Sequence, residues 1–173
     1  AGAGAAGPGP KGMRRLYVAT TPSADPDAIE VIRNSLASHF TLALGALEIP
    51  EFDFAYDPAR DQYASIAVLE SLTRALPADA AKLLAVTVRD LFIPVLTFVF
   101  GQAQLNGRVG VVSLARLRQE FYGLPSDEAI FLQRAAKEAL HETGHMFGLV
   151  HCADTACAMS LSTGVRQIDR KEA

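Results

Sequence analysis

The sequence predicts an α/β fold in which a twisted mixed sheet packs against helices. Three observations lead to this prediction. Apolar, β-branched runs alternate with stretches whose apolar residues recur at helical spacing. An Asn-Gly pair separates two further apolar runs, which indicates an antiparallel hairpin. The longest helical stretch comes late in the chain and is followed closely by a cluster of histidines.

The chain of 173 residues is long enough for one domain with its own hydrophobic core. Residues 1–12, AGAGAAGPGPKG, are small and almost uncharged, and they lack the charged-then-apolar order of a secretory signal. We interpret them as a disordered leader or a tag remnant, with Met13 as a natural start and residues 13–173 as a single domain. The missing signal favours a cytoplasmic location.

The first strand and helix are expected at residues 14–20 and 26–39. Ser23 and Asp25 are the candidate N-caps of this helix, and Pro26 lies in its first turn. The apolar residues that recur at helical spacing are Ile29, Ile32, Leu36 and Phe40.

The middle of the chain continues the alternation of strands and helices. ALEIPEF (46–52) is expected to form a second strand, interrupted by Pro50. Residues 56–63 read as a loop and 64–76 as a helix, while the apolar run 82–92 reads as one strand.

The hairpin and the last helix follow. Asn106-Gly107 predicts a tight turn, and Gly101 and Gly110 mark bulges or a close approach of the backbone. The helix is expected at about 126–147, with Ser126 as its N-cap and Asp127 and Glu128 in its first turn, before Gly148 ends it.

Charge and hydropathy exclude two classes of function. The net charge of −3 gives no basic field for nucleic acid, and positive charge is scattered along the chain. The most apolar stretch, 91–100, is about half the roughly 20 residues that a membrane span needs. We therefore expect no nucleic-acid partner and no membrane insertion, and we expect a monomer.

The strongest chemical signal is HETGHMFGLVHC, residues 141–152. His141 and His145 lie four residues apart, so both imidazoles can face one ion from a single face of a helix. Zinc accepts nitrogen ligands at about 2.0–2.1 Å. Glu142 lies beside the metal without binding it, a position that suits a general base acting on a zinc-bound water.

A third ligand distinguishes this pattern from a bare H-E-x-x-H, which also occurs by chance on helices. Gly148 permits backbone angles that a side chain disfavours, so the chain can leave the helix and bring His151 to the same ion. Three nitrogen ligands leave a fourth position open, as in a catalytic zinc site. His39 has no partner in sequence and reads as a surface histidine.

Beyond His151 the sequence continues as HCADTACAM. From His141 to Met159 the chain matches H-E-x-x-H-x-x-G-x-x-H-C-x-x-x-x-C-x-M and so resembles the archaemetzincins, a branch of the metzincin zinc peptidases. The resemblance extends upstream to RDQY (60–63) and to residues 86–114. It implies a metzincin-type zincin fold, with an antiparallel edge strand, the active-site helix and a short C-terminal subdomain at 149–173.

The resemblance also implies roles for single residues. Met159 matches the Met-turn methionine, which forms an apolar floor beneath the catalytic zinc, although composition alone would make it a core methionine. Cys152 and Cys157 match two of four thiolates that bind a second, structural zinc. The other pair would begin beyond residue 173, and we expect a truncated or disordered tail rather than true loss.

Two thiolates cannot close a tetrahedral zinc site. Within this chain Cys152 and Cys157 would bind zinc with foreign ligands, remain free thiols or form a disulfide, against which a reducing cytoplasm argues.

By analogy with metzincins, a peptide substrate pairs with an edge strand within Thr97–Gln104 through main-chain hydrogen bonds. An ordinary edge strand without a partner is the alternative. Asp90, Arg60 and Tyr63 are polar residues in suggestive places, but solvation at the surface explains each of them equally well.

The sequence thus indicates a zinc-dependent metallopeptidase, and the resemblance suggests processing of peptides from the amino end. One rival is a catalytically silent zinc protein that binds peptides or acts as a scaffold, against which Glu142 argues. Another is a deformylase-like hydrolase, against which His151 beyond Gly148 argues.

Overall fold

The computed structural model describes residues 14–173, so the leader and Met13 lie outside the described residues. In chain order the elements are β1 (Arg15–Thr20), α1 (Pro26–His39), β2 (Ala43–Glu48), η1 (Asp53–Ala55), β3 (Tyr56–Asp57), β4 (Gln62–Ala64), α2 (Ser65–Ala75), β5 (Ala80–Thr87), β6 (Leu91–Phe92), β7 (Gly101–Ala103), β8 (Val109–Ser113), η2 (Gln119–Tyr122), α3 (Glu128–Met146) and α4 (Val165–Asp169).

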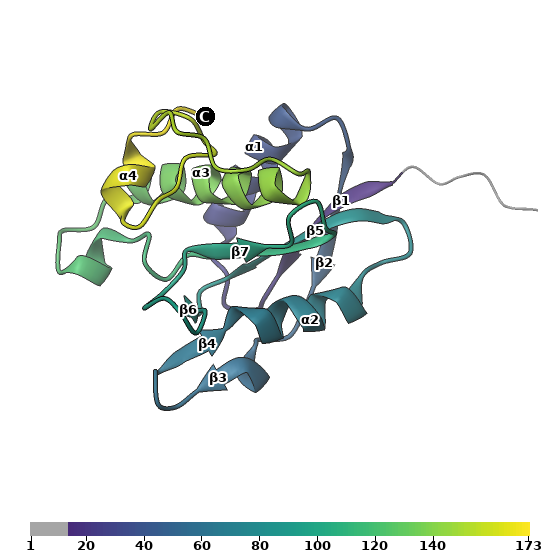
Figure 1. Cartoon of the computed structure of the whole chain (residues 1–173), viewed down its shortest axis with the longest axis horizontal. Coiled ribbons are helices and arrows are strands. Elements are labelled where there is room, and N and C mark those ends of the chain that lie inside the picture. Colours follow the sequence, from purple (N-terminus) through teal and green to yellow (C-terminus); the bar gives the residue numbers. More distant parts are fainter. Residues whose placement is uncertain (1–13) are drawn as a thin grey trace, which may run out of the picture.

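The main sheet is mixed, which confirms the predicted fold class. Its strand order is β2-β1-β5-β8-β7, and only β7 runs antiparallel to its neighbour, at one edge. A smaller sheet has the order β3-β4-β6. In Figure 1, α1 and α3 cover one face of the main sheet and α2 covers the other.

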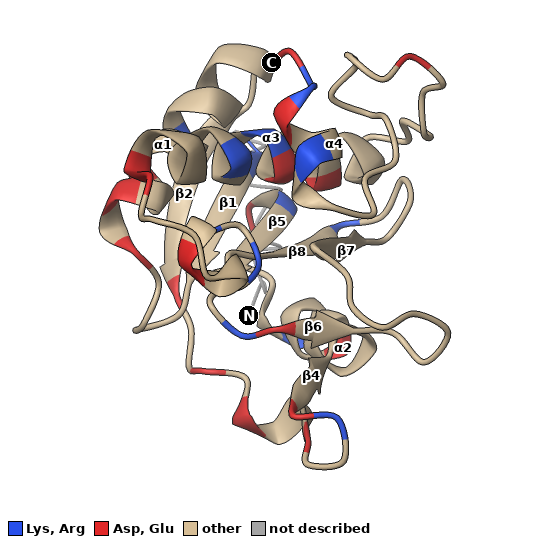
Figure 2. Ribbon diagram, turned by 90° about the vertical axis from the view of Figure 1, so that its left-hand side faces the viewer, with Lys and Arg blue, Asp and Glu red and all other residues tan. Residues whose placement is uncertain are grey.

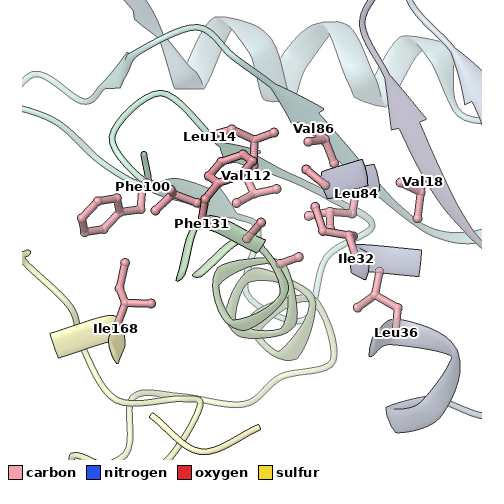
Figure 3. Close-up of a cluster of buried hydrophobic side chains, with 14 of the residues drawn as sticks. Val18, Ile32, Leu36, Leu84, Val86, Phe100, Val112, Leu114, Phe131 and Ile168 are labelled. Carbon is pink, nitrogen blue, oxygen red and sulfur yellow. The ribbon is translucent and has the colours of Figure 1, made fainter. Parts of the chain in front are cut away.

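The two faces follow from the alternation of side chains along a buried strand. Leu84 and Val86 of β5 join the core against α1 and α3, whereas Leu83 and Ala85 join the core against α2. Figure 3 shows the first of these cores, where Phe131 of α3 lies among strand residues. Because both faces are covered, the strands read as continuous apolar runs.

The helices α1 and α2 confirm the predicted bounds within one residue. Asp25 caps α1, because its Oδ1 accepts the backbone N–H groups of Asp27 at 2.8 Å and Ala28 at 3.2 Å. Ser23, the other candidate, instead binds Glu51. A side-chain acceptor at the first turn stabilises a helix by about 1 kcal/mol.

Two predictions for the segment before α2 were wrong. The second strand starts at Ala43 rather than residue 46 and ends before Pro50, because it pairs residue by residue with β1. The expected loop 56–63 instead contains β3 and the start of β4, which form a small hairpin. Asp61 has a φ of 51° at its turn.

The apolar run 82–92 is also not one strand. β5 ends at Thr87, whose Oγ1 accepts the backbone N–H of Arg89 at 3.1 Å and so turns the chain. The run resumes as β6, which belongs to the smaller sheet. The apolar residues on both sides of the break favoured one strand, although the charged pair Arg89-Asp90 marks the point where the chain leaves the sheet.

β7 and β8 form the predicted hairpin, but its turn is longer than the expected two residues. The backbone N–H of Gln104 still pairs with the carbonyl of Val109 at 3.1 Å, and Asn106 adopts a φ of 53°. The register of β7 with β8 runs without a bulge, so Gly101 and Gly110 mark close approaches instead.

The helix α3 is shorter than predicted at its start. Asp127, not Ser126, is the N-cap, and its Oδ1 accepts the N–H of Ile130 at 3.0 Å. Gly148 ends the helix as predicted, with a φ of 88°. The N–H of Leu149 reaches back to the carbonyl of Gly144 at 3.0 Å, which satisfies the end of the helix.

The segment after α3 folds back along the helix. Arg134 of α3 binds Asp169 of α4 through two hydrogen bonds of 2.8 Å, and Ile168 is fully buried in the core. In Figure 2, Lys and Arg are spread over several elements rather than gathered along one face. Among residues 14–173, no helix is long and apolar enough to span a membrane.

Candidate active site

Three histidines meet at the end of α3. His141 and His145 lie one turn apart on the helix, and their Nε2 atoms are 3.1 Å apart. The bend at Gly148 brings His151 back, so that its Nε2 lies 3.2 Å from that of His145. The structure therefore places all three predicted ligands in one cluster.

Main-chain carbonyls fix the protonation of two of these rings. His141 donates from Nδ1 to the carbonyl of Ala158 at 2.9 Å, and His145 donates from Nδ1 to the carbonyl of Leu149 at 2.7 Å. A carbonyl can only accept, so the proton of each neutral ring is on Nδ1 and the Nε2 lone pair faces the cluster.

This arrangement fits a zinc ion. Three tetrahedral nitrogen ligands at about 2.0–2.1 Å from zinc lie about 3.3 Å from one another, close to the observed separations. Lone pairs that face each other at this distance repel, and a cation between them removes that repulsion.

Burial favours the neutral form of two of the histidines, His141 and His151. His141 is 5% exposed, and burial, reinforced by the Lys171 ammonium, lowers its pKa to about 3. Burial and the neighbouring His145 also lower the pKa of His151. Because a metal ligand must be deprotonated, neutral rings at physiological pH favour binding.

Glu142 lies on the same turn and is 5% exposed. Burial raises the pKa of its carboxyl well above the ordinary value, and Glu138 raises it further while Lys171 opposes the shift. A Cβ on Gly101 of β7 would lie 2.7 Å from Cγ of Glu142 and 2.9 Å from its Oε1. The glycine therefore leaves the space that Glu142 occupies.

A buried ion pair lies beside the first histidine. The side chains of Lys171 and Glu138 are 0% and 3% exposed, and Nζ lies 3.2 Å from Oε1. The same Nζ is 3.4 Å from Nδ1 of His141. Sequence reasoning missed this pair, because no local pattern links residues 33 positions apart.

Met159 is buried beside the turn of α3 that carries the histidines. Its Sδ lies 2.5 Å from where a Cβ on Gly144 would be. Gly144, which sequence reasoning did not single out, therefore allows the sulfur to approach the helix backbone. Only the resemblance to a longer motif indicated a special place for Met159.

A cleft of about 430 Å³ opens onto the histidines. Residues Leu96 to Ala103 form one wall of the cleft, and Leu161–Thr163 also line the cleft. The carbonyl of Phe100 and the N–H of Gln104 form hydrogen bonds with β8. Because the main-chain groups of successive residues in a strand point to opposite sides, those of Gly101 and Ala103 face the open edge of the sheet.

The other singled-out residues lie outside the histidine cluster. Cys152 is exposed and Cys157 partly exposed, and both are free thiols. His39 is exposed, and its Nδ1 lies 2.7 Å from the carbonyl of Ser35. Asp90 and Arg60 are not merely solvated, because both form hydrogen bonds beside the cleft wall.

Tyr63 belongs to β4, where its backbone N–H binds the carbonyl of Asp90 at 2.8 Å. Its ring packs on that of Tyr56, with ring centres 5.2 Å apart.

The chain is similar to proteins of one peptidase family. The model of peptidase family M54 matches residues 53–173. An archaemetzincin of Methanocaldococcus jannaschii is 41% identical over 150 residues, which cover 84% of this chain and 82% of the relative.

Solved structures agree. The crystal structure of an archaemetzincin from Methanopyrus kandleri superposes with a TM-score of 0.80 at 34% identity, over 94% of this chain and 89% of the other. That of a zinc-dependent peptidase from Methanocorpusculum labreanum gives 0.81 at 29% identity, over 90% and 93%.

Proposed function

Because the chain belongs to peptidase family M54, the archaemetzincins, and is a zinc metallopeptidase, we propose that its catalytic zinc is held by His141, His145 and His151. The observation that carries the proposal is the convergence of three Nε2 atoms beside the buried Glu142. Zinc, when bound, polarises the scissile carbonyl and acidifies the attacking water.

Glu142 is proposed as the general base. Its carboxylate accepts the proton of the attacking water and then delivers it to the leaving amine. A base works best with a pKa near the operating pH, and burial shifts the pKa of Glu142 in that direction. Glu142 is held at this point by the helix behind it and by Gly101 in front.

The peptide substrate is proposed to lie along β7 as an added strand. The main-chain groups of Gly101 and Ala103 face the open edge there and can pair with an extended chain. Processing from the amino end, a cytoplasmic location and a monomeric state stay predictions.

Two further residues are proposed to shape the site. Met159 acts as the Met-turn floor, which its burial against Gly144 supports. Gly148 acts as the bend before the third ligand, which its φ of 88° supports.

Cys152 and Cys157 are proposed to supply two thiolates of a second, structural zinc, for which two more ligands are needed. Residues 149–173 as a separate subdomain stay a prediction.

The proposal is tested with Glu142→Ala and His151→Ala, by measuring zinc content and peptide cleavage on the same preparations. We expect Glu142→Ala to keep its zinc and lose about 10²–10⁴-fold in kcat. We expect His151→Ala to bind zinc poorly. Cleavage by Glu142→Ala at the wild-type rate would refute the mechanism, and zinc-loaded wild type that cleaves no peptide would favour the scaffold alternative.

A further inference from the structure

The cleft wall before β7 is an irregular segment held by side chains from elsewhere in the chain. Residues 93–98 form no strand, and Val95 and Leu96 are 83% and 51% exposed. Such a segment lacks the ladder of hydrogen bonds that fixes a strand. Yet Leu96 to Phe100 line the cleft directly, in continuity with β7.

Arg60 and Gln62 bind the main chain of this segment. Arg60 donates from Nη2 to the carbonyl of Leu96 at 2.6 Å and to that of Thr97 at 3.3 Å. Gln62, which is 7% exposed, donates from Nε2 to the carbonyl of Thr97 at 2.9 Å. Arg60 also donates from Nε to Oε1 of Gln62 at 3.2 Å, so the two side chains orient each other.

Asp90 and Arg116 extend the network to the next part of the wall. Gln62 donates to Oδ2 of Asp90 at 2.9 Å, and Arg116 binds both oxygens of Asp90 at 2.8 Å. The guanidinium of Arg116 lies 4.1 Å from the ring centre of Phe98, a cleft-lining residue. Charged and bidentate hydrogen bonds of this kind are the stronger ones in proteins.

None of these four side chains lines the cleft or bonds to a histidine of the cluster. They come from the turn before β4, from β4, and from the segments that follow β5 and β8. The network therefore contacts the wall and forms no hydrogen bond with the three histidines or with Glu142.

We propose that Arg60, Gln62, Asp90 and Arg116 are positioning residues for the substrate, which fix the wall Leu96–Phe100 against which the peptide lies. This inference rests on the proposed function, because it takes the peptide to run along the wall into β7. A group that contributes equally to binding of the substrate and of the transition state changes KM and leaves kcat unaltered.

The test compares Arg60→Ala and Gln62→Ala with the matched control Arg33→Ala. Arg33 of α1 also donates to a backbone carbonyl, that of Gly45 at 2.9 Å, but on the strand at the opposite edge of the sheet. For Arg60→Ala we expect KM for a peptide to rise about tenfold, the equivalent of one such hydrogen bond, with kcat within about twofold. Arg33→Ala should leave KM unchanged.

A conservative variant separates positioning from general destabilisation. Arg60→Lys keeps a cation that reaches one carbonyl, so it should recover part of the lost affinity. Zinc content should be the same in all variants, because none of the substituted side chains touches the histidines. A fall in kcat with unchanged KM, or loss of zinc from Arg60→Ala, would overturn the inference.

Amide hydrogen exchange of residues 93–104 gives a readout that does not depend on activity. Exchange there should be faster in Arg60→Ala and Gln62→Ala than in wild type, and unchanged in Arg33→Ala. Equal exchange rates in wild type and Arg60→Ala would show that the wall is stable without the hydrogen bonds from Arg60. If wild type cleaves no peptide, the proposed function fails, while exchange still decides whether the network fixes the wall.

Discussion

The helix α3 and the loop Phe147–Thr163 each supply histidines to one candidate site, but they hold these side chains in different ways. His141 and Glu142 on the helix are each 5% exposed, whereas His151 and Cys152 on the loop are exposed. The helix residues are fixed by packing on several sides. The loop is fixed mainly by its backbone, through the φ of Gly148 and the hydrogen bond from the N–H of Cys152 to the carbonyl of Met159 at 3.0 Å.

This difference determines where the site tolerates amino-acid substitutions. Substitution of a side chain that packs against the helix is expected to displace Glu142 or a histidine, or to leave a buried charge without its partner. An exposed side chain of the loop, such as that of Cys152, can change as long as the backbone path to His151 is kept. The following substitutions test this contrast.

Gly101→Ala should have the largest effect, because the added methyl group on β7 would clash with the Glu142 side chain of α3. The added Cβ would lie 2.5 Å from the carbonyl oxygen of Val111 and 2.7 Å from Cγ of Glu142. The backbone oxygen cannot yield, so we expect Glu142 to be displaced and kcat to fall about a hundredfold or more, with zinc retained. Gly164→Ala is the control, since nothing lies within 4 Å of its Cβ. An unchanged kcat in Gly101→Ala would contradict the role of this contact.

Lys171→Met should destabilise the fold by about 3–5 kcal/mol, because it leaves the Glu138 carboxyl buried without its counter-ion. Denaturant unfolding measures the loss. The double variant Lys171→Met, Glu138→Gln should regain most of it. A double variant as unstable as the single one would mean that Lys171 acts through packing alone.

The deficit of Lys171→Met should also depend on pH. Burial raises the pKa of Glu138, and Lys171 opposes this rise, so the variant raises the pKa further. Below about pH 4 the carboxyl is protonated in both the folded and the unfolded chain. The unfolded chain titrates in the same way in wild type and variant, so the deficit should grow, by up to about 1.4 kcal/mol per pH unit, between the pKa of Glu138 in the folded wild type and its higher pKa in the folded variant. Unfolding curves between pH 4 and 8 test the sign.

Gly148→Ala should have a smaller effect that is specific to the loop. A residue with a side chain in this left-handed conformation costs about 1–2 kcal/mol. Gly123→Ala is the matched control, because Gly123 has a φ of 71° and lies far along the chain from the histidines. Both variants should lose similar stability, but only Gly148→Ala should bind zinc more weakly, by about tenfold for about 1.4 kcal/mol of strain. Equal zinc affinities of Gly148→Ala and Gly123→Ala would show that Gly148 has no part in positioning His151.

Cys152→Ser should have the smallest effect. The thiol is exposed, and the loop is held by the backbone N–H of this residue, which serine keeps. In this chain, where Cys152 and Cys157 are only two of the four ligands that the proposed second zinc needs, we expect the free energy of unfolding to change by less than about 0.5 kcal/mol and peptide cleavage to stay the same. Loss of cleavage would mean that the loop depends on side chains after all.

Sequence reasoning succeeded where the chemistry is local. The spacing of His141, Glu142 and His145, and the bend at Gly148, depend only on neighbouring residues, and helix periodicity placed them correctly. The fold class followed equally well from the alternation of strands and helices.

It failed where distant segments meet. Nothing local predicts that Lys171 is fully buried against Glu138. For Arg60 and Asp90 the sequence left a specific role and surface solvation equally open for the same reason, because the partners that decide between them lie 26 to 37 positions away. The break after Thr87 was missed because the apolar residues on both sides outweighed the charged pair Arg89-Asp90 between them.

The burial of Lys171 has a consequence for the order in which the protein matures. Glu138 leaves the ribosome 33 residues before Lys171, so the carboxyl must wait for its counter-ion. Until Lys171 docks, packing of α3 onto the sheet would leave an ionised Glu138 without compensation beside His141. The packing of α3 around Glu138 is therefore complete only when residue 171 has been made and has folded back onto the helix.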